Sequence, residues 1–223
     1  MAKHKDRVSS RELYESLQRI TAVSAIAPRQ AFARLPDTSQ QQAKELRTMK
    51  KFRFQLLHRW LVEHFDPCRV ADIGGGKGLL AYLLQNSGWD AHVIDPVDQA
   101  LPDKYKDIKT KRQTRIPASA RVPRSTAMFA PEMAADYDLL IGLHAHGCNA
   151  MVVETAVTTG CGFILLPCCV IDEPFTPPPG VDWLESLATF AVEKGHAIMP
   201  FQLNFKGQNI GLCSIGRAPV RQV

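Results

Sequence analysis

Four glycines crowd one short stretch of the chain, and their spacing could serve nucleotide chemistry. The stretch reads ADIGGGKGLL from Ala71 to Leu80. Glycine adopts positive φ at little cost and lets another group approach the backbone closely. The sequence therefore predicts a tight turn with a ligand against its backbone, built from Gly74, Gly75, Gly76 and Gly78.

Three kinds of nucleotide-binding loop compete for this stretch, and spacing separates them. A P-loop lysine is followed by Ser or Thr, whereas Lys77 is followed by Gly78. The dinucleotide fingerprint needs a small residue where Leu79 stands, which weakens that interpretation. The remaining pattern is an acidic residue followed by alternating glycines, which begins at Asp72.

A second acidic residue stands where a ribose-binding carboxylate is expected. Asp95 ends the apolar run AHVI, 23 residues after Asp72. In nucleotide-binding folds of this general type, an acidic residue about 20 residues onward binds the ribose hydroxyls. The alternative is that Asp95 only starts a turn before Pro96.

Two further segments place reactive side chains after apolar runs. DLLIGLHAHG ends with His144 and His146, and GFILLPCC ends with Cys168 and Cys169. Ligands bind at the carboxyl ends of parallel strands, so these residues are expected at the same edge of the sheet. His144 is our candidate proton acceptor, since imidazole titrates near neutrality. The alternative is that His144 only packs or shapes its loop.

The adjacent cysteines admit three interpretations. Cys168 could be a nucleophile that adds to a pyrimidine ring, which requires an accessible thiolate. The pair could join the two histidines and Cys148 around a zinc ion. The thiols could also pack as small apolar groups, as cysteine often does. Because adjacent cysteines rarely share one ion in a structural site, we favour packing and assign no metal ligand.

These residues need an α/β scaffold, which the pattern around them predicts. From residue 68 short apolar runs alternate with helical patterns, typical of a Rossmann-like, doubly wound and mostly parallel sheet. The last two runs flank Gly207 and predict a C-terminal antiparallel hairpin. Upstream, helices are expected over 9–26, with a Ser9–Glu12 capping box, and over 39–65. We therefore expect an N-terminal helical extension over 1–66 and the ligand-binding domain over 67–223.

Composition and charge narrow the partners. The 223 residues carry a formal charge of +5, and the segment from Lys104 to Arg124 holds eight cations and one acid. Such a segment attracts phosphate backbones, which makes RNA the leading partner, although a solvated surface is the alternative. The N-terminus is polar and lacks the apolar core of a secretory leader, and no apolar run approaches the ~20 residues of a membrane span. We expect a cytoplasmic location without membrane association.

The motifs resemble those of one enzyme family. The pattern from Asp72 to Gly78 resembles the first motif of class I S-adenosylmethionine-dependent methyltransferases. GLHAHG, beginning at Gly142, together with the later PCC resembles the GLHACG and PCC of a subgroup that includes the glutathione S-transferase C-terminal-domain-containing and RNA-methyltransferase-like proteins. In this chain His146 replaces the subgroup's cysteine, and MKK at 49–51 is similar to a lysine pair of that subgroup.

The resemblance implies a methyltransferase that uses S-adenosyl-L-methionine and acts on RNA, either tRNA or rRNA. The alternatives are a non-catalytic module that keeps the fold and binds RNA or a protein, and an NAD-dependent oxidoreductase. We assign catalytic roles to His144 and Cys168. The donor is expected to contact Asp72, Gly74, Gly75, Gly76, Gly78, Asp95, Leu143 and His144.

Overall fold

A computed structural model describes residues 10–22 and 50–216 of the chain. Within these ranges no helix combines the length and apolar character needed to cross a bilayer. Its helices and 3-10 turns are α1 (Ser10–Ala22), η1 (Lys50–Phe52), α3 (Arg53–His64), α4 (Leu79–Gln85), η2 (Pro131–Asp136), α5 (Asn149–Thr159) and α6 (Trp183–Glu193). Its strands are β1 (Arg69–Ile73), β2 (Asp90–Ile94), β3 (Lys104–Lys106), β4 (Gln113–Arg115), β5 (Arg124–Ser125), β6 (Leu139–Leu143), β7 (Gly162–Leu166), β8 (Met199–Gln202) and β9 (Ile210–Ser214).

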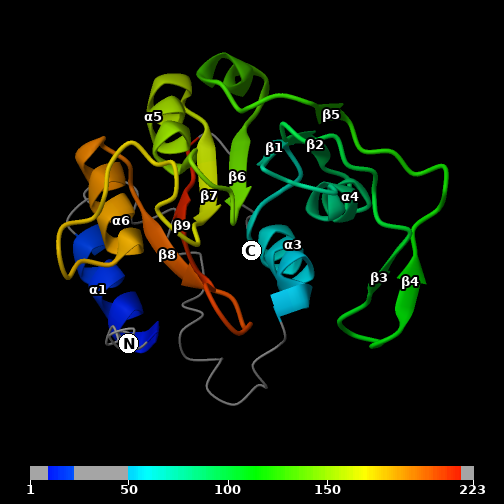
Figure 1. The fold of residues 1–223 in the computed structure, drawn as a ribbon, viewed down its shortest axis with the longest axis horizontal. Helices are drawn as coiled ribbons and strands as arrows, with labels where there is room; N and C mark the ends of the chain where they lie inside the picture. Colours follow the sequence, from blue (N-terminus) through cyan, green and yellow to red (C-terminus); the bar gives the residue numbers. More distant parts are fainter. Residues whose placement is uncertain (1–9, 23–49, 217–223) are drawn as a thin grey trace, which may run out of the picture.

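A seven-stranded sheet forms the centre of the molecule, in the order β5-β2-β1-β6-β7-β9-β8 (Figure 1). The five strands from β5 to β7 are parallel, and β9 runs antiparallel to both β7 and β8. The chain moves outward from β1 to β2 and β5, and outward from β6 to β7 on the other side. The pair β1 and β6 is therefore the switch point, where open α/β sheets bind ligands. The doubly wound sheet and its final antiparallel hairpin are confirmed.

Helices cover both faces of the sheet because successive strand residues point to opposite faces. Leu140 belongs to the hydrophobic cluster that also contains Leu17 of α1 and Leu187 of α6. Its neighbour Leu139 belongs to the other cluster, with Leu57 of α3. Figure 1 accordingly shows α1, α5 and α6 on one side of the sheet, with α3 and α4 on the other. The result is a three-layer α/β/α arrangement.

The two expected N-terminal helices lie only partly within the described residues, and residues 23–26 of the first fall outside them. The expected helix over 9–26 corresponds to α1, and Ser9 of its capping box lies outside the described residues. The expected helix over 39–65 corresponds to η1 followed by α3, and residues 39–49 lie outside the described part. Phe65 ends α3 in an extended conformation just before Pro67.

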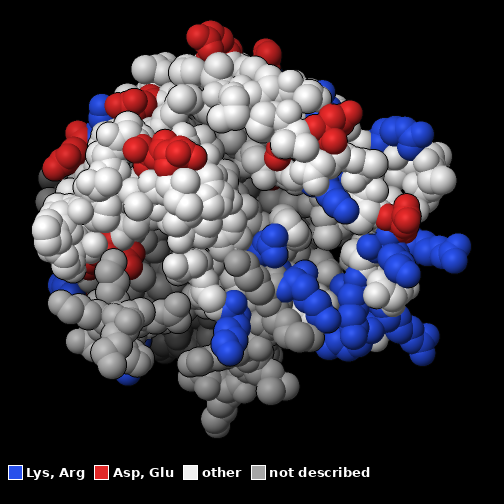
Figure 2. All heavy atoms as spheres, in the orientation of Figure 1, with Lys and Arg blue, Asp and Glu red and all other residues white. Residues whose placement is uncertain are grey.

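The basic segment contains strands that the sequence analysis does not anticipate. Strands β3 and β4 pair as a separate antiparallel hairpin, which projects beside α4 in Figure 1. Gln55 of α3 holds this hairpin, because its Nε2 donates to the carbonyl of Lys106 and its Oε1 accepts from the amide of Ile108, each at 2.8 Å. Figure 2 shows Lys and Arg side chains gathered over this side of the molecule. The hairpin thus presents its cations from a fixed position.

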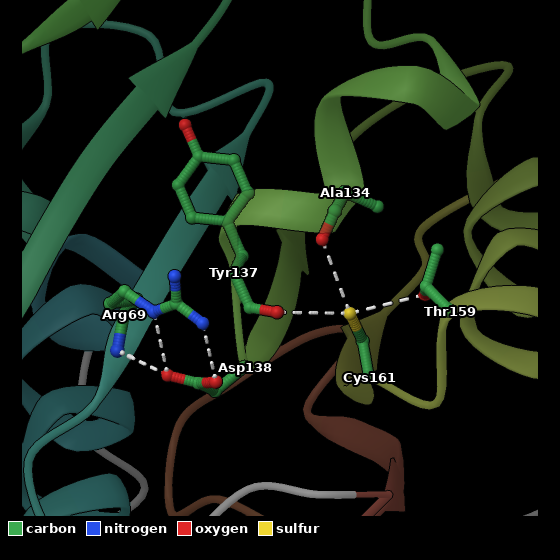
Figure 3. A network of polar contacts seen from close by, with 6 residues as sticks. All are labelled: Arg69, Ala134, Tyr137, Asp138, Thr159 and Cys161. Atoms are coloured by element: carbon green, nitrogen blue, oxygen red, sulfur yellow. Dashed lines mark hydrogen bonds and ion pairs between the residues drawn. The ribbon is translucent and has the colours of Figure 1, made fainter.

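A polar network fixes the amino ends of the strands, at the opposite edge of the sheet from the glycine turn (Figure 3). Arg69 donates to Asp138 from its backbone N at 3.1 Å and from its side chain at 3.2 and 3.1 Å. The Cys161 thiol donates to the carbonyls of Tyr137 and Ala134 at 3.1 and 3.4 Å. These contacts hold the amino ends of β1 and β6 and the 3-10 helix η2 in place. The loops at the opposite edge of the sheet are therefore attached to a fixed frame.

Candidate functional site

The glycine turn after β1 uses positive φ at three of its four glycines. Gly74, Gly76 and Gly78 have φ of 64°, 54° and 75°. The Gly74 amide donates to the carbonyl of Ile94 at 2.8 Å, which ties the turn to the end of β2. Gly78 is the N-cap of α4. Side chains rarely adopt such φ values, so the turn itself demands glycine at these three positions.

Most of the glycines clear space for the protein's own atoms. A Cβ on Gly75 would lie 2.6 Å from Oδ2 of Asp72, and one on Gly74 would lie 3.0 Å from the Cβ of Ala145. A Cβ on Gly76 would find its nearest neighbour only at 4.0 Å. Gly76 is therefore the glycine of the turn with open space against its backbone. The predicted contact of all four glycines with a ligand stays a prediction, and the structure shows open space at Gly76.

Asp72 lies beneath the turn and braces it from inside. Its side chain is 2% exposed, and Oδ2 has no hydrogen-bond partner among the described residues. Burial raises the pKa of Asp72 to about 7, against the opposing effects of the Ala81 amide that donates to it and of the nearby Arg124 cation. The carboxyl thus shapes the turn and the start of α4 instead of reaching into open space.

Asp95 stands at the tip of β2 and faces the same turn. Its Oδ2 accepts from the amide of Gly76 at 2.9 Å, and its Oδ1 accepts from the amide of Val97 at 2.8 Å. The second contact is the local turn given above as the alternative interpretation of this residue, and the first joins Asp95 to the glycine turn. Each carboxylate oxygen has two acceptor sites, which leaves each able to accept one hydroxyl from a ligand.

Arg124 is a site residue that the sequence analysis missed. It was counted within the basic segment, yet its side chain is only 13% exposed. Its guanidinium donates to the carbonyls of Gly76 and Val97, which lie on the two loops that flank Asp95. No local pattern marks Arg124, because the contact depends on β5 pairing beside β2.

The loop after β6 meets the glycine turn at the switch point. Leu143 ends β6 and is buried, and Ala145 packs against Gly74. His144 has φ of 59°, and its amide donates to the carbonyl of Leu166 at 3.1 Å. Both ring nitrogens of His144 are shielded from solvent, and the ring meets Phe205 edge-on at 6.4 Å between centroids. His144 therefore packs at the site with its nitrogens turned inward.

The two cysteines after β7 contact His146 at the carboxyl edge of the sheet, where the sequence analysis expects all three residues. Sγ of Cys168 lies 3.4 Å from Nε2 of His146, and Sγ of Cys169 lies 3.1 Å from Nδ1. The sulfurs are 3.6 Å apart. Cys148, the third thiol considered above, is buried, and burial raises its pKa to about 12. The packing interpretation fits Cys148 better than it fits Cys168 and Cys169.

An open pocket flanks the glycine turn on the side of β2. It has a volume of about 460 Å³ and is lined by Lys77 and residues 99–104. It lies beside the turn and not at the β1–β6 switch point, where the glycine turn and the loop after β6 meet.

Sequence similarity to two curated relatives covers under half of the chain. No protein-family model matches it. A Caenorhabditis elegans protein named "Probable tRNA (uracil-O(2)-)-methyltransferase" is 31% identical over 104 residues, which are 46% of this chain and 17% of that protein. The human protein of the same name is 30% identical over 103 residues, 45% of this chain and 12% of the relative. The chain thus matches less than a fifth of the length of these curated relatives.

Among solved structures, the chain is similar to monomeric WbdD. The match covers 87% of this chain and 51% of that one, with a TM-score of 0.40 and 16% sequence identity.

Proposed function

We propose that this chain is an S-adenosylmethionine-dependent methyltransferase that acts on tRNA. One observation carries the proposal: the glycine turn and Asp95 meet at the carboxyl edge of the sheet, joined by the Gly76 amide. The names of the curated relatives, which describe tRNA methyltransferases, support the reaction class. The cytoplasmic location stays a prediction.

The glycine turn and Asp95, which together we call the donor cradle, have the chemistry to bind an adenosyl-type ligand. Asp95 keeps acceptor capacity for two ribose hydroxyls, and the backbone of Gly76 borders open space. Asp72, Gly74, Gly75 and Gly78 act indirectly in this proposal, because they give the turn its shape. Leu143 and His144 would line the side of the donor site opposite Asp95, where the loop after β6 packs against the glycine turn.

The bound donor would supply a methyl group on a sulfonium carbon. The chain's own task is then to hold donor and acceptor in line at close range, which by itself lowers the barrier substantially. For His144 to accept a proton from an acceptor hydroxyl, its ring would have to turn outward from the position described above.

The acceptor atom decides whether Cys168 is needed as a nucleophile. The relatives' names specify an oxygen acceptor, and methylation of an oxygen does not require a thiol to add to the pyrimidine ring. A covalent role for Cys168 stays a prediction. It is tested with Cys168→Ala, which would abolish methyl transfer and spare donor binding if the thiol attacks the base.

The β3–β4 hairpin supports RNA as the substrate. Lys104 and Arg115 stand directly opposite each other across the two strands, and both are exposed. Like charges in this position destabilise a hairpin, by about 0.2–1 kcal/mol per pair. A phosphate backbone would relieve that repulsion, and contacts to phosphate supply most of the affinity of non-specific RNA binding. The basic segment is therefore our candidate for holding the tRNA backbone.

Calorimetry with S-adenosylhomocysteine tests the donor site. We expect the full chain to bind it and Asp95→Ala to lose most of the affinity, because two acceptors for the ribose disappear. Asp90→Ala is the matched control, since Asp90 is an exposed carboxylate at the other end of the same strand. No binding by the wild-type chain, or equal binding by the Asp95 variant, would refute the donor site.

Transfer of a labelled methyl group separates the enzyme from the non-catalytic module. We expect label from S-adenosylmethionine in total tRNA and, after digestion, in a nucleoside methylated on oxygen. RNA binding without any label transfer would instead establish the binding module.

A further inference from the structure

Three side chains that commonly bind metals meet beside the proposed donor cradle. His146 comes from the loop after β6, and Cys168 and Cys169 come from the loop after β7. One ligand atom from each lies within 4.8 Å of the other two. His146 is exposed and the cysteines are half-buried, so an ion can reach them from solvent. The methyl-transfer proposal gives this cluster no task when the acceptor is an oxygen.

Two of the distances between the ligand atoms are close to those of a tetrahedral zinc site, and one atom from each of the three side chains lies within 4.8 Å of the other two. With Zn–S near 2.3 Å and Zn–N near 2.0–2.1 Å, two sulfurs on one ion lie about 3.8 Å apart and a sulfur and a nitrogen about 3.6 Å apart. The sulfurs of Cys168 and Cys169 are 3.6 Å apart, and Cys168 Sγ lies 3.4 Å from His146 Nε2. Cys169 Sγ lies 3.1 Å from the other ring nitrogen, Nδ1, so the exposed imidazole would have to turn to present one nitrogen to an ion between the sulfurs.

The backbone arranges the cluster before any ion binds. Adjacent side chains of an extended chain point in opposite directions, yet both sulfurs face the same imidazole. Glu173 ties the cysteine loop to the start of α5, accepting from the amides of Asn149 and Ala150 at 3.0 and 3.1 Å. Both loops are therefore held in place by contacts outside the cluster.

We propose that His146, Cys168 and Cys169 bind one zinc ion, with a fourth position left to water. Two thiolates and one imidazole suit the borderline-soft zinc ion, and three protein ligands with an open position are typical of catalytic zinc sites. Binding releases the two thiol protons to solvent. Because Ala145 packs against Gly74, an ion here would lock the loops after β6 and β7 beside the donor cradle.

Zinc titration of the reduced full chain tests this site independently of methyl transfer. After removal of metal with a chelator, the protein competes for zinc against a chromophoric chelator. We expect one equivalent to bind, and we expect His146→Gln, Cys168→Ser and Cys169→Ser each to weaken binding by more than about 100-fold. Cys68→Ser is the matched control, because Cys68 is a half-buried thiol outside the cluster and its loss should leave zinc affinity unchanged.

A second measurement identifies the ligands directly. Cobalt in place of zinc should give thiolate-to-metal charge-transfer absorption that Cys168→Ser and Cys169→Ser each reduce. Circular dichroism checks folding, and the exposed position of His146 makes His146→Gln the variant expected to fold normally. The proposal is overturned if the folded wild-type chain binds no zinc, or if zinc affinity survives loss of His146 and of each cysteine.

Discussion

Asp72 shows how one buried carboxyl links the glycine turn to the stability of the fold. Its pKa is raised to about 7 from an ordinary value of 3.8, so the folded chain binds a proton more tightly than the unfolded chain. The free energy of unfolding must then fall as pH rises from about 4 to 7, by a few kcal/mol in total. Above pH 7 this contribution becomes constant.

We therefore predict that Asp72→Asn removes this pH dependence, so that its urea midpoint compared with that of the wild-type chain is higher near pH 7 than near pH 4. Urea unfolding at several pH values, compared with the wild-type chain, measures the difference. Asp90→Asn, an exposed carboxyl outside the turn, should keep the wild-type slope. Equal slopes for Asp72→Asn and the wild-type chain would show that the buried carboxyl is not the cause.

Arg124 is expected to affect donor affinity without touching the donor itself. Arg124→Gln loses the two carbonyl contacts that hold the Gly76 and Val97 loops together, so we expect weaker binding of S-adenosylhomocysteine by roughly tenfold. Arg121→Gln is the control, since Arg121 is exposed and its side-chain hydrogen bonds within the described part of the chain go to its own loop. Equal affinity for S-adenosylhomocysteine in the two variants would contradict a role of Arg124 in the donor site and leave it with a role in RNA binding alone.

At the scale of elements, we predict that one substitution in the hairpin β3–β4 raises the stability of the chain and weakens its binding to tRNA. Lys104→Glu replaces a repulsive cross-strand pair with an attractive one, so the chain should gain about 0.5 kcal/mol of stability. The same substitution should weaken tRNA binding and lower its salt dependence, because at least one phosphate contact is lost. Thermal unfolding and binding at several salt concentrations measure both effects.

The control for this prediction is Lys194→Glu, which reverses a charge on α6, away from the hairpin. It should leave the salt dependence of tRNA binding unchanged. If Lys104→Glu left both tRNA affinity and its salt dependence intact, the hairpin would not be an RNA-binding surface.

At the scale of the whole molecule, both faces of one sheet must fold together. Leu17 of α1 is fully buried in the cluster formed by α5, α6 and one face of the sheet. Trp60 and Trp89 lie in the cluster on the other face. Since β1 and β6 supply residues to both clusters, loss of packing on one face should destabilise the entire domain.

We predict that Leu17→Ala lowers the free energy of unfolding by about 2–5 kcal/mol, the usual range for this change in a core. Circular dichroism and tryptophan fluorescence should report the same shifted midpoint. The exposed Arg11→Ala on the same helix should change little. Separate midpoints for the two signals would show that α1 unfolds alone and belongs to an independent extension, as a boundary near residue 66 would imply.

Much of the scaffold is readable from local pattern. Buried parallel strands are continuous apolar runs, so β1, β2, β6 and β7 lie where the sequence indicates them. The short strands β3 and β5 carry charged residues and have no such pattern, and they form because neighbouring strands and α3 supply their partners. Strands of two or three residues depend on tertiary contacts more than on their own composition.

The sequence by itself indicated a doubly wound, mostly parallel sheet, the glycine turn, and the places of Asp72 and Asp95 near the carboxyl ends of two strands, because glycine spacing and apolar runs are local properties. Three features were decided only by the tertiary structure. The Asp72 carboxyl is buried under the glycine turn, and the Arg124 guanidinium donates to the carbonyl of Gly76. The imidazole of His146 contacts the two cysteines. The contacts of Arg124 with Gly76 and of His146 with the two cysteines join residues on different strands or loops. Their partners are set by how the sheet is wound, which no local pattern encodes.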